Sequence, residues 1–221
     1  MNQNYIFTSE SVSAGHPDKV ADQISDALVD AGFKAGDETT RVAVETLVTT
    51  NHVTLAGEVK NFNVTTEEVE QIVRNKVKEI GYEQDGFHWK NLTINNQTIN
   101  NKLHSQSADI ALGTDDFGAG DQGIMFGYAC NDNEAYLPAP IYYAHRIMRE
   151  LNVQRLAGTI LGPDAKSQVS VQYEGGKPTR IDQVVVSTQH TSADNVEEAR
   201  AICRAAAERV CDGLIDKDTV W

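Results

Sequence analysis

The chain has 221 residues, 40% hydrophobic and 23% charged, which is enough for one or two globular domains. Its 19 basic and 32 acidic residues give a formal net charge of −13, which argues against a nucleic-acid partner because such partners need clustered Lys and Arg. No apolar run approaches the roughly 20 residues of a membrane span, and the first residues lack a secretory pattern. Three cysteines without a C-x-x-C motif suit a reducing compartment, so we expect a cytoplasmic protein.

The first half of the sequence predicts a helix, two strands and a second helix. Helical and alternating spacings of apolar residues indicate, in chain order, a helix over 17–33, strands over 41–50 and 53–59, a helix over 66–80, and a possible short strand at 92–94. Pro17 suits the first turn of its helix, where a missing N–H costs nothing. Thr65 and Glu68 form a capping-box pattern, and Gly81 closes the helix that follows.

The second half repeats this order of elements. The same spacings predict a helix near 141–151, strands near 167–174 and 179–188 joined by a turn at 174–178, and a helix over roughly 195–214. We therefore expect an α+β fold of repeated helix–strand–strand–helix units, with helices on one face of antiparallel or mixed sheets.

The approach to the first helix, from Phe7 to Lys19, concentrates chemistry-bearing residues. It contains a histidine, two acids, a lysine, four hydroxyls and a glycine. His16 and Asp18 lie at the predicted helix N-terminus, where free N–H groups and the helix dipole favour an anion or its metal complex. The alternative is an ordinary capped helix, with Ser13 or His16 closing its end.

Acids within predicted strands form a second group of candidates. Glu45 and Glu58 stand among apolar and small residues, where an acid needs a partner or a cation unless that strand face is solvated. Asp164 and Lys166 place a metal-ligating acid beside a phosphate-binding cation, although such a pair is also common on ordinary surfaces.

Two further segments have alternative readings. Gly118-x-Gly120-x-x-Gly123 fits the dinucleotide-binding pattern, but it follows no strand and no βαβ unit surrounds it, so a tight turn is favoured. Residues 106–116 lack hydrophobic periodicity, as expected either for an active-site lid or for a plain surface loop. The sequence has no P-loop, no zinc-ligand spacing and no hydrolytic nucleophile motif.

The opening stretch FTSESVSAGHPDKVADQISDALVD resembles the signature of S-adenosylmethionine synthetases. Four later segments resemble the same family in the same order: 41–46, 118–128, 162–169 and 187–190. The family has three α+β units around a pseudo-threefold axis, and the resemblance implies two of them here. These are residues 13–127, including a gate loop at 106–116, and residues 1–12 with 128–221. The third unit is expected to be missing, because family members continue beyond Trp221.

The resemblance also implies an activity, namely formation of S-adenosylmethionine from ATP and L-methionine with release of phosphate and diphosphate. It implies two Mg²⁺ and one K⁺ per site, and a homodimer or dimer of dimers with active sites between subunits. The implied roles are His16 and Lys166 in catalysis; His16, Asp164, Ala165 and Lys166 on ATP; Glu10, Glu58, Gln106 and Asp121 on methionine; Asp18 and Asp164 on Mg²⁺; Glu45 on K⁺; and Gln106, Asp109, Gly113 and Asp116 in the gate loop. The alternative is a non-catalytic fragment or a partner-dependent binding module, and we expect residues 1–221 alone to be inactive.

Overall fold

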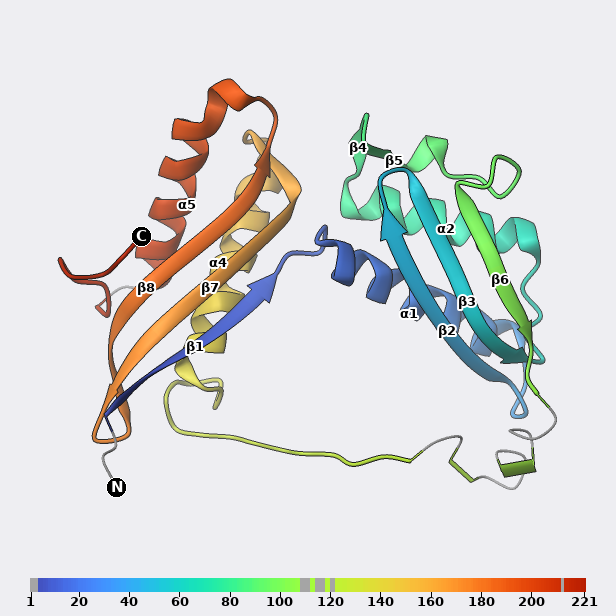
Figure 1. Cartoon of the computed structure of the whole chain (residues 1–221), viewed down its shortest axis with the longest axis horizontal. Helices are drawn as coiled ribbons and strands as arrows, with labels where there is room; N and C mark the ends of the chain where they lie inside the picture. The colour runs from blue at the N-terminus through green and yellow to red at the C-terminus, as the bar shows by residue number, and fades with distance from the viewer. Residues whose placement is uncertain (1–3, 108–111, 114–117, 120–121, 212) are drawn as a thin grey trace. The chain divides into compact units, whose positions relative to one another are not determined.

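The computed structural model describes residues 4–107, 112–113, 118–119, 122–211 and 213–221. The chain forms two compact units. The discontinuous unit contains residues 1–16 and 126–221, and the continuous unit contains residues 17–125. Each unit has a three-stranded sheet with helices packed against it (Figure 1), which confirms the expected α+β class. Among the described residues, every helix is too short or too polar to serve as a membrane span.

The continuous unit has a mixed sheet in the order β2-β3-β6, with β2 antiparallel and β6 parallel to the central β3. Its elements are α1 (Pro17–Ala35), β2 (Arg41–Thr49), β3 (His52–Lys60), α2 (Thr66–Ile80), β4 (Glu83–Gln84), β5 (Phe87–His88), the 3-10 helix η1 (Trp89–Asn91) and β6 (Ile99–Ser105). The expected strand at 92–94 is wrong: the third strand of the sheet is β6. Leu92 is fully buried, but it follows η1 and belongs to no strand.

The core of this unit lies between the helices and one face of the sheet. The apolar stripes of α1 and α2 and the inward residues of the sheet form a single buried cluster, which includes Ile24, Leu28, Val73, Val53 and Leu55. Because side chains alternate along a strand, Glu45 and Glu58 lie on the opposite face. That alternation explains how the sheet carries acids without burying them.

The capping box of α2 is confirmed. Glu68 N donates to Thr65 Oγ1 at 3.2 Å, and Thr65 N donates to Glu68 Oε2 at 2.8 Å. Gly81 closes the helix in the left-handed conformation, with φ 104°. These two local signals therefore define both ends of the helix.

The discontinuous unit has an antiparallel sheet in the order β1-β7-β8. Its elements are β1 (Tyr5–Val12), α4 (Ala139–Leu156), β7 (Leu161–Glu174), β8 (Lys177–His190), the 3-10 helix η2 (Ala193–Asn195) and α5 (Val196–Val210). Figure 1 shows β7 in the centre, with α4 and α5 on one face of the sheet. The N-terminal strand β1 thus pairs with a strand about 160 residues later, at Glu10↔Gln168 and Val12↔Lys166.

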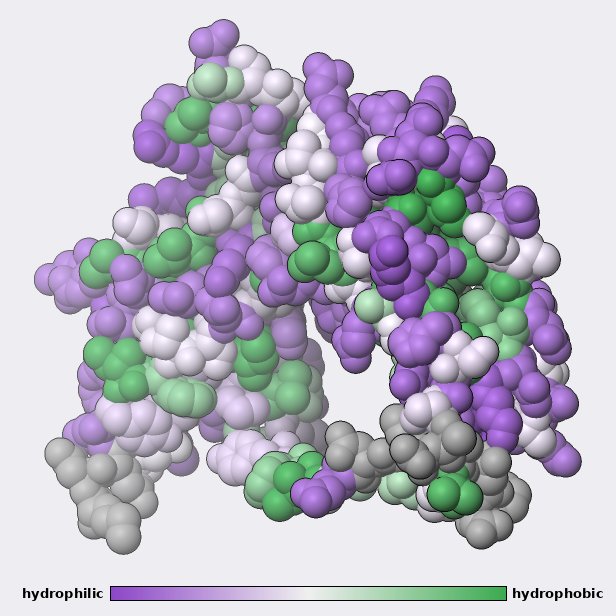
Figure 2. Space-filling view, turned by 45° about the vertical axis from the view of Figure 1, so that its right-hand side comes forward, coloured by the Kyte–Doolittle hydropathy of each residue, from purple (hydrophilic) through white to green (hydrophobic). Residues whose placement is uncertain are grey.

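Strand β7 begins six residues earlier than expected and alternates between the two faces. Odd-numbered residues such as Val169, Val171 and Tyr173 are buried against the helices, whereas Asp164 and Lys166 lie on the other face. The candidate acid and lysine are therefore part of the strand itself. Hydrophilic residues cover most of the surface visible in Figure 2, with separate hydrophobic areas between them.

Candidate functional site

The turn that follows β1 is attached to the beginning of β7. Ser13 N donates to Ala165 O at 2.8 Å, and Gly15 N donates to Pro163 O at 3.1 Å. The Ser13 hydroxyl donates to Pro163 O and accepts from Ala165 N, each at 2.7 Å. His16 N donates to Ser13 O at 3.1 Å, which closes the turn immediately before α1. The Ser13 hydroxyl therefore bonds to the backbone of β7. The capping alternative had instead expected this hydroxyl at the N-terminal end of the helix.

Gly15 is required by this close approach of two backbones. A Cβ at position 15 would lie 2.3 Å from Pro163 O, a distance that real Cβ atoms essentially never show. The glycine thus allows the histidine motif to lie directly against β7.

Charged side chains from both segments meet at this junction. Asp164 N donates to Gln189 Oε1 at 3.2 Å, which ties the acid to β8. Burial raises the pKa of the Asp164 carboxyl, and the charge of His16 acts in the opposite direction. Lys166 Nζ lies 2.8 Å from Glu10 Oε2. The structure therefore pairs residues of the two predicted segments in two places: Glu10 with Lys166, and His16 with Asp164.

Ala165, expected at ATP, is placed differently from its neighbours. Its side chain is 6% exposed and belongs to the core beneath the sheet. Its N–H and carbonyl both bond to Ser13. Ala165 therefore supports the junction through its backbone.

A second group of predicted residues lies in the continuous unit, where β3 and β6 end. Glu58 Oε1 is 3.7 Å from His104 Nε2, and Ser107 N donates to Glu58 Oε2 at 3.4 Å. Gln106 N donates to Val59 O at 2.9 Å, while its side-chain Oε1 is buried and has no hydrogen-bond partner among the residues that the structure describes. A buried acceptor without a partner is costly unless a ligand or water supplies a donor. Glu58 thus accepts a hydrogen bond from the residue that directly follows Gln106.

The remaining predicted residues are more scattered. Glu45 is exposed on β2 opposite Ala56, one diagonal step from Glu58. Asp18 is exposed in the first turn of α1. Gly113 is exposed, and Asp109, Asp116 and Asp121 lie outside the described residues. Within the described part of the chain, no three His, Cys, Asp or Glu side chains form a ready-made metal site.

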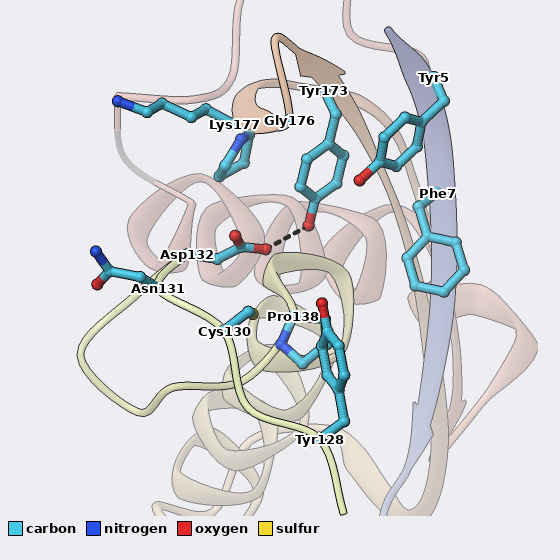
Figure 3. A pocket seen from close by; sticks show the side chains of 11 residues that line it. Tyr5, Phe7, Tyr128, Cys130, Asn131, Asp132, Pro138, Tyr173, Gly176 and Lys177 are labelled. Atoms are coloured by element: carbon cyan, nitrogen blue, oxygen red, sulfur yellow. Dashed lines mark hydrogen bonds between the residues drawn. The ribbon is translucent and has the colours of Figure 1, made fainter. Parts of the chain in front are cut away.

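A cavity of about 860 Å³ lies elsewhere in the discontinuous unit and contains none of the predicted residues. Figure 3 shows its aromatic wall, formed by Tyr5, Phe7, Tyr128 and Tyr173. Tyr173 donates to Asp132 Oδ2 at 2.6 Å, and burial raises the pKa of its phenol. Asp132 also accepts from the N–H of Ala139, at the beginning of α4. This acid lies seven residues before that position, so no local capping pattern could identify it.

Comparisons with known proteins agree with the sequence motifs. Residues 4–108 match the N-terminal domain of S-adenosylmethionine synthetase, and residues 116–220 match its central domain. The S-adenosylmethionine synthase of Rhodospirillum centenum is 52% identical over 227 aligned positions, covering 99% of this chain and 57% of that protein. The enzyme of Parvibaculum lavamentivorans is 53% identical over 215 positions, covering 94% and 54%. That of Pelagibacter ubique is 54% identical over 205 positions, covering 90% and 51%.

The chain therefore belongs to the S-adenosylmethionine synthetase family, as the resemblance indicated. It contains sequence of the family's N-terminal and central domains. The chain spans about half the length of the curated relatives it matches.

Proposed function

We propose that this chain supplies the phosphate-binding part of a methionine adenosyltransferase, which forms S-adenosylmethionine from ATP and L-methionine. The observation that carries the proposal is the junction at which the Ser13–His16 turn places His16 beside Asp164 and in the same unit as Lys166. A histidine, an acid and a lysine at one junction suit a triphosphate and the metal that accompanies it.

In the proposed reaction, the methionine sulfur attacks C5′ of the ATP ribose. The C5′–O bond breaks, its electron pair leaves with the triphosphate, and the sulfur becomes a sulfonium. The thioether carries no proton, so this step needs no general base. A protonated His16 would donate a hydrogen bond to the departing oxygen, and Lys166 would oppose the charge on the phosphates. Hydrolysis of the triphosphate to phosphate and diphosphate then completes the reaction.

The acidic residues would hold cations and methionine. Mg²⁺ usually takes one or two protein carboxylates and completes its shell with phosphate oxygens and water, so Asp164 and Asp18 fit as partial donor sets for two ions. When bound, Mg²⁺ would neutralise phosphate charge. Glu45 would hold K⁺. Glu58 would pair with the methionine ammonium, and Gln106, Glu10 and Asp121 are the further candidates for binding methionine.

The assembly is part of the same proposal. We infer a homodimer or a dimer of dimers with active sites between subunits. Lys166 and His16 are the cations that we expect this chain to place at the ligand. Two cations are too few to balance about four negative charges, because the uncompensated charges repel strongly at low dielectric. We therefore expect no turnover from residues 1–221 by themselves.

The proposal is tested by calorimetric titration of the chain with a non-hydrolysable ATP analogue and Mg²⁺. Asp164→Asn and Lys166→Ala should each weaken binding, and Asp164→Asn should also weaken Mg²⁺ affinity. Unchanged titrations in both variants would contradict the assignment. In an assembled enzyme that turns over, His16→Ala should lower kcat by about 10²–10³, the usual loss for one electrostatic donor.

The expected inactivity of residues 1–221, and with it the alternative of a non-catalytic binding module, is tested by an activity assay. Adenosylmethionine formation would be followed with ATP, methionine, Mg²⁺ and either K⁺ or Na⁺. Clear turnover by monodisperse residues 1–221 would exclude the module and contradict our expectation of inactivity. Stimulation by K⁺ that is lost in Glu45→Gln would support the potassium site.

A further inference from the structure

Ser13 uses all of its polar atoms at the junction between the turn and β7. Its N–H donates to Ala165 O, its carbonyl accepts from His16 N, and its hydroxyl donates to Pro163 O while accepting from Ala165 N. A hydroxyl with both a donor and an acceptor bond at 2.7 Å has a fixed orientation. The side chain therefore holds a defined place between two segments 150 residues apart in sequence.

The two backbone groups that the hydroxyl contacts stand on either side of Asp164. Pro163 O precedes this residue and Ala165 N follows it. The same serine closes the turn that contains His16 through its own carbonyl. Ser13 thus sets the position of His16, in the turn after β1, relative to Asp164 in β7.

Removing the hydroxyl would loosen this arrangement without detaching it. The backbone bonds Ser13 N to Ala165 O and Gly15 N to Pro163 O do not involve the side chain, so they would remain. Ala165 N, in a residue only 6% exposed, would lose its acceptor. A buried N–H left without an acceptor is unfavourable, so the turn is expected to shift.

We propose that Ser13 is a positioning residue, which sets the distance between His16 and Asp164 so that both act on one triphosphate. This inference rests on the proposed function, because it assigns a task within that site. It predicts that Ser13 acts through His16 and has no separate contact with the ligand.

The test is calorimetric titration of the full chain with inorganic tripolyphosphate in the presence of Mg²⁺. Ser13→Ala should weaken binding about tenfold, in line with a lost buried hydrogen bond. Ser13→Thr keeps the hydroxyl and should recover most of the affinity. Because Ser13 acts through His16, the double variant Ser13→Ala/His16→Ala should bind no more weakly than His16→Ala alone.

Thr8→Val is the matched control. It removes another hydroxyl bond between β1 and β7, the one that joins Thr8 Oγ1 and Ser170 Oγ at 2.8 Å, and should leave tripolyphosphate affinity unchanged. Thermal unfolding of each variant shows whether it is folded at the titration temperature. Additive losses in the double variant, affinity within twofold for Ser13→Ala, or no recovery in Ser13→Thr would each overturn the proposal.

Amide hydrogen exchange tests, without a ligand, whether the Ser13 hydroxyl holds the turn against β7. Ser13→Ala should accelerate exchange at Ala165 and Gly15 relative to Thr8→Val, and unchanged exchange would overturn the proposal. Failure of the unsubstituted chain to bind tripolyphosphate would instead contradict the proposed function, while the exchange experiment would still decide whether Ser13 holds the junction.

Discussion

Lys166 Nζ lies 2.8 Å from Glu10 Oε2, on a diagonal between neighbouring strands. The side chains of this pair are 43% and 53% exposed, so the ion pair is worth at most about 1 kcal/mol. Glu10 thus orients Lys166, the lysine expected to bind phosphate. Breaking this ion pair costs little free energy. If Lys166 binds phosphate as proposed, the same acid would compete with phosphate for the lysine.

Replacing Glu10 with Gln should therefore strengthen the binding of metal-free tripolyphosphate. We expect a gain of about two- to fivefold at low ionic strength, corresponding to a surface pair of at most about 1 kcal/mol. Salt should reduce the gain, because it screens exposed charges. Calorimetric titration at two salt concentrations measures both effects. Glu174→Gln, at the far end of β7, is the control, and weaker binding by Glu10→Gln would contradict the competition.

Substitution of Gly15 with Ala should disrupt the junction. The added Cβ would lie 2.3 Å from Pro163 O, and a backbone atom cannot move aside as a flexible side chain can. We expect a loss of about 1–3 kcal/mol in the free energy of unfolding, typical of overpacking. Urea unfolding measures the loss. Gly127→Ala is the control, since nothing lies within 4 Å of its Cβ position, and equal effects in the two variants would refute the steric argument.

The stability of the chain should depend on pH through Asp164. Its folded-state pKa is raised by burial, so below about pH 3.8 the carboxyl is protonated in both states and costs nothing. As pH rises through the folded-state pKa, the buried charge appears and stability is lost. Asp164→Asn should therefore match the unsubstituted chain near pH 3.5 and become the more stable protein by pH 7.

Chemical unfolding across this pH range tests the expectation. Asp26→Asn is the control, because Asp26 is an exposed acid on α1. A stability difference that is constant between pH 3.5 and 7 would show that the Asp164 charge is not its source.

Loss of the α2 cap should destabilise the continuous unit. Thr65→Ala removes the acceptor of Glu68 N, and such caps contribute about 0.5–2 kcal/mol. Thr66→Ala, one residue inside the helix, should have a much smaller effect. Urea unfolding followed by circular dichroism compares the two, and equal losses would argue against a specific cap.

Much of the fold could be predicted because its signals are local. A few neighbouring residues are enough to recognise the capping box at Thr65 and the glycine at position 81. The same is true of the apolar faces of α1 and α2. Strand β6 was missed because INNKLHS is rich in polar residues of low strand propensity, and only its pairing with β3 makes it a strand. The early part of β7 was missed because Gly162 and Pro163 are typical of turns.

The candidate site shows the same division. The motifs around His16 and Asp164 were recognisable from residue type and order, but their juxtaposition depends on pairing between β1 and β7. Neither the hydroxyl bonds of Ser13 nor the close approach at Gly15 has a signature within its own segment. The role of Asp132 at the start of α4 was hidden for the same reason, since its partners Tyr173 and Ala139 come from other parts of the chain.

The late partner of β1 has a consequence for biosynthesis. Residues 17–125 form a compact unit from consecutive sequence, and can fold as soon as they leave the ribosome. Tyr5–Val12 must wait for residues 166–173, which at about 5–20 residues per second is a delay of roughly 8–32 s. During that interval the first strand has no neighbour in its own sheet, so its backbone N–H and C=O groups lack their strand partners. Translation speed over the second half of the message should therefore influence the yield of native protein more than speed over the first.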